Sequence, residues 1–122
     1  MTAATVLVAE DDEDILLLVA TRLKRDGFDV VTARNGVEAL ELVREHRPRI
    51  AVLDISMPPP DGLEVVRQIR ADSELGGIRL LLLTAKARRT DMSVGLAAGA
   101  DAYVSKPFSP AELSARVRDL LA

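Results

Sequence analysis

The sequence predicts a doubly wound α/β domain, with a five-stranded parallel sheet covered by helices on both faces. Five short apolar runs alternate with five longer segments whose apolar residues recur at helical spacing. Runs such as Thr5–Ala9 are apolar at successive positions, as expected of strands that are buried on both faces. The 122 residues are enough for one such sheet and too few for two independent cores. We therefore expect residues 1–122 to form one domain.

The first half of the chain supplies three strands and two helices. Strands are expected at Thr5–Ala9, Asp29–Ala33 and Ile50–Asp54, and helices at Asp12–Asp26 and Gly36–His46. The first helix ends before a glycine, Gly27, which is typical of a C-cap. The second helix is expected to bury Val37, Leu40 and Val43 along one stripe.

The second half begins with a proline-rich loop, Met57–Gly62, and then continues the alternation. The predicted third helix, Leu63–Arg70, turns Leu63, Val66 and Ile69 inward. The remaining elements are a strand at Ile78–Leu83, a helix at Arg89–Ala98, a short strand at Ala102–Val104 and a final helix that Ser109 caps. Ser109, Pro110 and Glu112 match a capping box with proline at the first helical position.

Composition excludes several classes of function. Without cysteine, disulfides, thiol chemistry and Cys-based zinc sites are excluded, and the single His46 excludes a multi-histidine metal site. The net charge of −3 gives no reason to expect this domain to bind nucleic acid or membranes directly. Apolar runs fall far short of the ~20 residues that a membrane-spanning helix needs.

The chain termini carry little further information. The N-terminus lacks a basic region followed by an apolar segment, so we expect no signal peptide and a cytoplasmic location. The sequence stops at Ala122, at the end of the fifth predicted helix. We expect either a stand-alone domain or a fragment that was cut at a domain boundary.

Polar residues gather where the predicted strands end. Ligands of doubly wound sheets bind beyond the carboxyl ends of the strands. Glu10 and Asp11 follow the first strand, Asp54 ends the third, Thr84 follows the fourth and Lys106 lies after the fifth. These side chains are expected to converge on one edge of the sheet.

The acids at this edge suggest a metal site. Carboxylates after the first strand can simply favour the positive end of a helix, which is the expected role of the acidic run Asp12–Asp14. Asp54 precedes a loop and caps no obvious helix. Clustered carboxylates raise one another's pKa, and an oxygen-preferring cation such as Mg²⁺ relieves that repulsion. A metal-bound carboxylate beside a lysine and a hydroxyl suggests phosphoryl chemistry, including an aspartyl phosphate.

Four segments resemble the receiver domain of two-component response regulators. They are VLVAEDDED at 6–14, LDISMPPPDG at 53–62, LLTA at 82–85 and GADAYVSKPFS at 99–109, in the order and spacing of that family. The resemblance covers essentially the whole chain and implies a flavodoxin-like receiver fold with strand order 2-1-3-4-5. It also implies a self-modifying signalling switch with autodephosphorylation, rather than a turnover enzyme.

The resemblance implies a role for each polar residue at the edge. Asp54 would accept the phosphoryl group, Lys106 would contact it and Thr84 would hydrogen-bond it. Mg²⁺ would be held by Asp11, Asp54 and the Ser56 backbone carbonyl, and by Glu10 through water. Family spacing favours Glu10 and Asp11 over Asp11 and Asp12 as the acidic pair.

Further implied features concern the switch. Tyr103 matches the aromatic switch position, which would move together with Thr84, and the Lys106–Pro107 bond resembles a cis peptide of the family. Glu10 replaces the more usual Asp and Pro60 replaces Met or Leu. Lys86 stands where many receivers carry an acid or a small residue. We hypothesise that Lys86 alters access to Asp54, which Lys86→Ala would test by changing phosphorylation or dephosphorylation rates.

The resemblance also implies partners. A sensor histidine kinase or a phosphotransfer protein would dock on the first helix, near Thr21, Arg22 and Arg25, and an effector would follow the domain or stand separately. Residues 95–121 resemble the dimerising face of the winged-helix subfamily, in which Asp101, Glu112 and Arg116 would pair across a two-fold axis. Ala102 replaces a second acid there, so we predict a monomer or a weak or phosphorylation-dependent homodimer.

Two other functions are left open by the residues. A pseudo-receiver that binds proteins without taking phosphate is one alternative, although the acceptor, acids, hydroxyl and lysine are all present. A haloacid-dehalogenase-like phosphohydrolase is another, but it needs an acid at the position of Ser56 and a nucleophile on the first strand. A nucleotide-binding domain is disfavoured because no Gly-rich loop follows the first strand.

Overall fold

The computed structural model describes residues 3–85 and 89–122, with the backbone alone at positions 89–92. Lys86 therefore lies outside the described residues. In the described part, five parallel strands form one sheet in the order β2-β1-β3-β4-β5, which confirms the predicted fold and strand order. The elements in chain order are β1 Thr5–Ala9, α1 Glu13–Arg25, β2 Asp29–Ala33, α2 Gly36–His46, β3 Ile50–Asp54, α3 Gly62–Ala71, a 3₁₀ turn Ser73–Leu75, β4 Arg79–Thr84, α4 Arg89–Ala98, β5 Ala102–Ser105 and α5 Pro110–Leu121.

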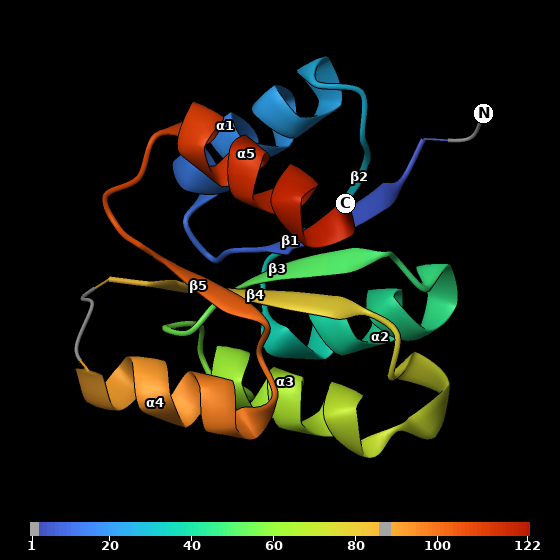
Figure 1. The fold of residues 1–122 in the computed structure, drawn as a ribbon, viewed down its shortest axis with the longest axis vertical. Coiled ribbons are helices and arrows are strands. Elements are labelled where there is room, and N and C mark those ends of the chain that lie inside the picture. Colours follow the sequence, from blue (N-terminus) through green and yellow to red (C-terminus); the bar gives the residue numbers. More distant parts are fainter. Residues whose placement is uncertain (1–2, 86–88) are drawn as a thin grey trace.

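Helices cover both faces of the sheet (Figure 1). α1 and α5 lie on one face, and α2, α3 and α4 lie on the other. Side chains of each strand alternate between the two resulting cores, so Val6 and Val8 pack with the α1–α5 layer while Leu7 packs with the α2–α4 layer. All five residues of β3 are buried, because β3 is the central strand and both of its faces are covered.

Polar side chains cap the helices whose starts are described. The Asp12 carboxylate accepts hydrogen bonds from the Asp14 and Ile15 amides at the start of α1. The Asn35, Asp61 and Ser109 side chains do the same for α2, α3 and α5. The acidic run Asp12–Asp14 thus belongs to a helix N-terminus, as the sequence suggests.

The predicted buried stripe of α2 is wrong at Val37, whose side chain is 54% exposed. The residues that α2 buries are Gly36, Ala39, Leu40 and Val43, which lie along one face at helical spacing. Val37 follows Gly36 in the helix. Because each residue of a helix points in a different direction from the one before it, the Val37 side chain faces solvent. In α3, Val65 is buried along with Val66 and Ile69, whereas Leu63 is only partly buried.

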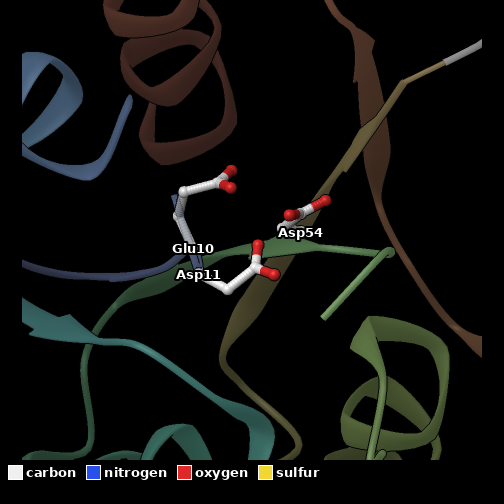
Figure 2. Close-up of side chains that lie close together, drawn as sticks. All are labelled: Glu10, Asp11 and Asp54. Carbon is white, nitrogen blue, oxygen red and sulfur yellow. The ribbon is translucent and has the colours of Figure 1, made fainter. Parts of the chain in front are cut away.

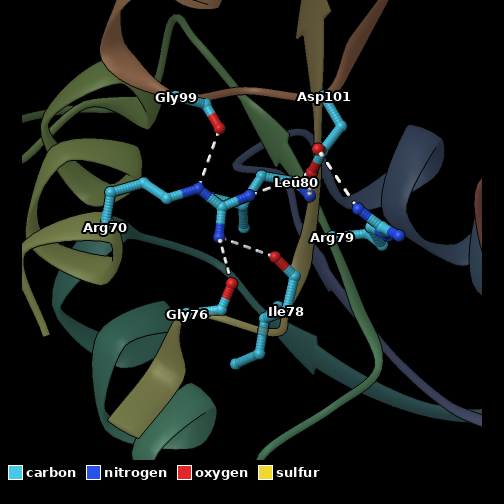
Figure 3. Close-up of polar contacts among 7 residues, drawn as sticks. All are labelled: Arg70, Gly76, Ile78, Arg79, Leu80, Gly99 and Asp101. Carbon is cyan, nitrogen blue, oxygen red and sulfur yellow. Dashed lines mark hydrogen bonds and ion pairs between the residues drawn. The ribbon is translucent and has the colours of Figure 1, made fainter. Parts of the chain in front are cut away.

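Arg70 ties the end of α3 to the turn between α4 and β5 (Figure 3). Its guanidinium donates to the carbonyls of Gly99 (2.9 Å) and Ile78 (2.7 Å), and it forms an ion pair with Asp101 at 2.9 Å. The same Asp101 oxygen accepts from the Leu80 amide at 2.7 Å. Asp101 is therefore engaged within the chain.

Among the described residues, no helix combines the length and apolar character that crossing a bilayer requires.

Candidate functional site

Three carboxylates meet at the carboxyl edge of the sheet. β1 pairs with β3 so that Ala9 lies opposite Leu53, and this register brings Glu10 and Asp11 beside Asp54. One oxygen from each of the three carboxylates lies within 4.8 Å of the others. Figure 2 shows the three side chains directed toward a common space. The predicted convergence of these acids is confirmed.

The three acids differ in their exposure. Glu10 and Asp54 are 1% and 0% exposed, whereas Asp11 is exposed. The site is thus closed toward the sheet and open toward solvent at Asp11.

Lys106 faces the buried acids from the end of β5. Its ammonium lies 2.9 Å from Glu10 Oε2 and 3.3 Å from Asp54 Oδ2. The Lys106–Pro107 peptide is cis, as the resemblance implies. One cation therefore neutralises part of the charge of two buried carboxylates.

Burial and charge shift the pKa values in this cluster. Burial raises the pKa of Glu10 to about 7, and Lys106 opposes this rise while Asp54 adds to it. Burial alone would raise the pKa of Asp54, but contacts with Glu10, the Ser56 amide and Lys106 hold it below its usual range. Burial would lower the pKa of Lys106, yet the two carboxylates raise it. The directions of these pKa shifts favour the ionised form of Asp54 over that of Glu10.

Ser56 orients the Asp54 carboxylate. Its backbone amide and its hydroxyl both donate to Asp54 Oδ1, at 3.1 and 2.9 Å. The other oxygen, Oδ2, faces Lys106. Only the backbone carbonyl of Ser56 is implied by the resemblance, whereas the structure adds its amide and hydroxyl. An Asx-type turn, in which an aspartate accepts from the residue two positions later, is the signal that could have indicated this second contribution.

The cluster suits a hard divalent cation. Among the described side chains, Glu10 Oε2 and Asp54 Oδ2 are buried without a well-formed hydrogen bond. Three carboxylates with the ammonium of Lys106 beside the two buried ones carry excess negative charge, and their oxygens match the all-oxygen coordination that Mg²⁺ prefers. Glu10, Asp11 and Asp54 could hold such an ion.

Thr84 and Tyr103 continue the site along the sheet. Asp54 pairs with Leu83, and Thr84 pairs with Ser105, so the buried Thr84 lies one residue beyond the strand partner of Asp54. The Lys106 amide donates to the Thr84 carbonyl at 2.6 Å. Thr84 and the partly buried Tyr103 line one narrow crevice together with Ile55. The two predicted switch residues are therefore neighbours.

The predicted docking surface on α1 is more apolar than expected. Thr21 and Arg25 are exposed, whereas Arg22 is half-buried and pairs with Asp26 at 2.9 Å. The side chains of Leu17 and Leu18 are 67% and 55% exposed. These five α1 side chains line a groove of about 470 Å³ together with Asp14 and Pro110.

Comparison with known proteins identifies a family. The sequence model of the response regulator receiver domain matches residues 6–118. The chain is 43% identical to the alkaline phosphatase synthesis transcriptional regulatory protein PhoP of Bacillus subtilis, over 95% of this chain and 48% of that protein. It is 42% identical to the DNA-binding response regulator MtrA of Mycobacterium tuberculosis H37Rv, over 93% of this chain and 48% of that protein. The chain thus spans about half the length of these curated relatives.

Solved structures agree with the sequence comparison. The chemotaxis response regulator CheY4 of Vibrio cholerae superimposes with a TM-score of 0.92 at 31% identity, covering 98% of this chain and 99% of that one. The BeF3-activated DrrB receiver domain superimposes with a TM-score of 0.86 at 33% identity, covering 98% and 97% of the two chains.

Proposed function

This chain belongs to the response regulator receiver domain family, and on that premise we propose that it accepts a phosphoryl group on Asp54 from a phosphohistidine. The observation that carries the proposal is the grouping of Glu10, Asp11 and Asp54 around one space, with Lys106 facing the two buried acids. Carboxylates that can hold a cation, a lysine and a hydroxyl at one edge of the sheet are groups that stabilise charge in phosphoryl transfer.

The transfer is a displacement at phosphorus. Oδ2 of Asp54 forms the new O–P bond while the N–P bond of the phosphohistidine breaks, and its electron pair stays on the imidazole nitrogen. Asp11, Asp54, the Ser56 carbonyl and, through water, Glu10 would hold Mg²⁺, which supplies charge neutralisation to the phosphoryl oxygens. Lys106 pairs with one phosphoryl oxygen and the Thr84 hydroxyl donates to another. Water later hydrolyses the acyl phosphate, which resets the switch.

The signal leaves through the face made by α4, β5 and α5. The phosphoryl group adds about two negative charges. Lys106 and Thr84 move toward that charge, and Tyr103 turns into the space that Thr84 leaves in their shared crevice. Phosphorylation therefore shifts the population toward an arrangement with a different α4–β5–α5 face.

The partners follow from the same proposal. A sensor histidine kinase or a phosphotransfer protein docks on α1, where Leu17 and Leu18 give the groove an apolar centre and Arg22 and Arg25 give it a charged rim. An effector domain or a separate effector receives the signal, and the curated relatives are named as transcriptional or DNA-binding regulators. Location in the cytoplasm stays a prediction from the sequence.

The proposed activity is a single self-modification and its reversal. A haloacid-dehalogenase-like phosphohydrolase is opposed by Ser56, which stands where an acid is needed, and by the position of Asp54 on β3. The pseudo-receiver alternative predicts that Asp54 is never modified.

Phosphate-affinity electrophoresis tests the proposal. The full chain is incubated with acetyl phosphate and Mg²⁺, beside Asp54→Asn and the matched control Asp14→Asn, an exposed acid of α1. We expect a shifted band for the wild type and for Asp14→Asn, and none for Asp54→Asn or after chelation of Mg²⁺. No shifted wild-type band would favour a pseudo-receiver, and continuous release of phosphate from small esters would favour a phosphohydrolase.

A further inference from the structure

Two glycines touch the loop that follows the candidate phosphoacceptor. This phosphoacceptor loop, residues 55–61, connects β3 to α3 and carries Ser56. Gly36, the first residue of α2, lies against Pro60 of this loop. Gly62, the first residue of α3, lies against the backbone of Asp54 and Ile55, where the loop begins.

Neither glycine leaves room for a side chain. A Cβ atom on Gly36 would overlap the Pro60 carbonyl oxygen and would lie 2.8 Å from Pro60 Cγ. A Cβ on Gly62 would lie 2.5 Å from the Asp54 carbonyl oxygen and 2.9 Å from Ile55 Cα. Real Cβ atoms essentially never approach backbone this closely. The loop, or the start of the helix that carries the glycine, would have to move to admit either side chain.

The backbone conformation at Gly36 and Gly62 does not by itself require glycine. Gly27 and Gly99 are the glycines with positive φ in the described residues, so Gly36 and Gly62 adopt conformations open to other residues. Both are first residues of helices, where alanine is well tolerated. The close approach to the loop is therefore what excludes a side chain.

The loop in turn fixes the Asp54 carboxylate. Ser56 donates two hydrogen bonds to Asp54 Oδ1, at 3.1 and 2.9 Å, and Asp54 Oδ2 thereby faces Lys106 at 3.3 Å. A shift of the loop moves Ser56 and so rotates the carboxylate. It would also move the Ser56 carbonyl, which the proposed function places on the metal.

We propose that Gly36 and Gly62 are positioning residues. They hold the phosphoacceptor loop in the position in which Asp54 and Ser56 can bind Mg²⁺ together. This inference rests on the proposed function for its purpose, but its geometry can be tested separately. A small residue at the start of α2, on an element that supplies none of the candidate ligands, would thus control the site.

Calorimetric titration of Mg²⁺ into the full chain tests the proposal. We expect Gly36→Ala to raise the Mg²⁺ dissociation constant about tenfold, as when a group that orients a metal ligand is disturbed. The matched control is Gly77→Ala, because a Cβ there would meet no atom within 4 Å and its φ is not positive. Urea unfolding without Mg²⁺ and the NMR shift of the Ser56 amide are measured on the same variants.

The outcomes separate positioning from a merely structural role. Weaker Mg²⁺ binding and a moved Ser56 amide signal in Gly36→Ala, with Gly77→Ala like the wild type, would support the proposal. A folded Gly36→Ala with unchanged Mg²⁺ affinity would overturn it. If Gly36→Ala does not fold, Gly62→Ala decides by the same titration, and failure of both variants to fold would also count against positioning.

The proposed function can fail independently. A wild-type chain that binds Mg²⁺ but takes no phosphate would refute phosphorylation, while the titration would still test the two glycines. If the wild type binds no Mg²⁺ either, the Ser56 amide shift alone decides, and an unmoved signal in Gly36→Ala would overturn the proposal.

Discussion

The Lys106 ammonium lies closer to Glu10 than to the candidate phosphoacceptor, with 2.9 Å to Glu10 Oε2 against 3.3 Å to Asp54 Oδ2. Both acids are buried and Lys106 is their shared counter-charge. In the unmodified protein, the positive charge of Lys106 therefore offsets part of the energetic cost of burying two carboxylates. On phosphorylation, the same ammonium is available to pair with the new charge.

Replacing Lys106 should destabilise the fold. Lys106→Met leaves Glu10 and Asp54 buried without their cation, and we expect a loss of about 1–3 kcal/mol in the free energy of unfolding. Urea unfolding without Mg²⁺ measures the loss, with the exposed Lys24→Met as control. Saturating Mg²⁺ should reduce the difference from wild type, and a variant as stable as wild type would contradict this role of Lys106.

Mg²⁺ should stabilise the protein through Asp11. A ligand that binds only the folded state adds about 2.7 kcal/mol at a concentration of a hundred times its dissociation constant. We expect Asp11→Asn to abolish most of this gain, whereas Asp14→Asn, an exposed acid on α1, should retain it. The measurement is the urea midpoint with and without Mg²⁺. An equal gain in Asp11→Asn and wild type would remove Asp11 from the candidate ligands.

Acid should weaken the contact between α1 and α5. Hydrogen bonds from Ser114 and Arg22 hold the pKa of Asp26 below its usual range. Because its folded pKa is depressed, Asp26 contributes stability above the ordinary value of 3.8, and this is lost as pH falls through the lower folded pKa. The difference in urea midpoint between wild type and Asp26→Asn should therefore shrink below pH 3.8. A difference between wild type and Asp26→Asn that stays constant with pH would refute the assignment.

Arg70 should matter far more than its neighbour Arg67. Arg70 donates to Gly99 and Ile78 and pairs with Asp101, so we expect Arg70→Met to lower the free energy of unfolding by about 2 kcal/mol. Arg67 is exposed and pairs only weakly, at 3.7 Å, with Glu64, so Arg67→Met should cost less than about 0.5 kcal/mol. Urea unfolding compares the two, and equal losses would contradict the special role of Arg70.

Self-association should be weak without phosphorylation. The sequence suggested Asp101 as a partner across a two-fold axis, but the structure gives it Arg70, the Leu80 amide and, at 3.8 Å, Arg79 within the chain. Exposed ion pairs contribute only ~0–1 kcal/mol each, so ion pairs of Glu112 and Arg116 alone would stabilise a dimer only slightly. Sedimentation velocity should show a monomer, with any dimer appearing only with acetyl phosphate and Mg²⁺. A tight dimer without phosphorylation would contradict this.

Most of the architecture follows from local sequence patterns. The first three strands, Thr5–Ala9, Asp29–Ala33 and Ile50–Asp54, have the predicted bounds, because apolar runs between glycine, proline and capping residues define them. The acids of the site were predictable because parallel strands end at one edge. Val37 was mispredicted because apolar residues at nearby helical positions allow more than one stripe, and only packing against the sheet selects the buried one.

Contacts between segments that lie far apart in the chain could not be predicted from the sequence. The partners of Arg70 come from two separate segments, the stretch before β4 and the turn between α4 and β5, and no local pattern indicates them. The approach of Gly36 to Pro60 depends on how α2 packs beside the phosphoacceptor loop. Such contacts arise from the tertiary arrangement, which periodicity and capping preferences do not specify.

The contact between Asp26 and Ser114 joins residues 88 positions apart. Leu16, Val19 and Leu23 of α1 share one core with Leu113 and Val117 of α5. Strand residues such as Val6 and Val8 cover part of this α1 face, but during synthesis on the ribosome the part that packs against α5 stays uncovered until almost the whole domain is translated. Because α5 is the last element in the chain, its docking on α1 is a late step that closes the core on this face of the sheet.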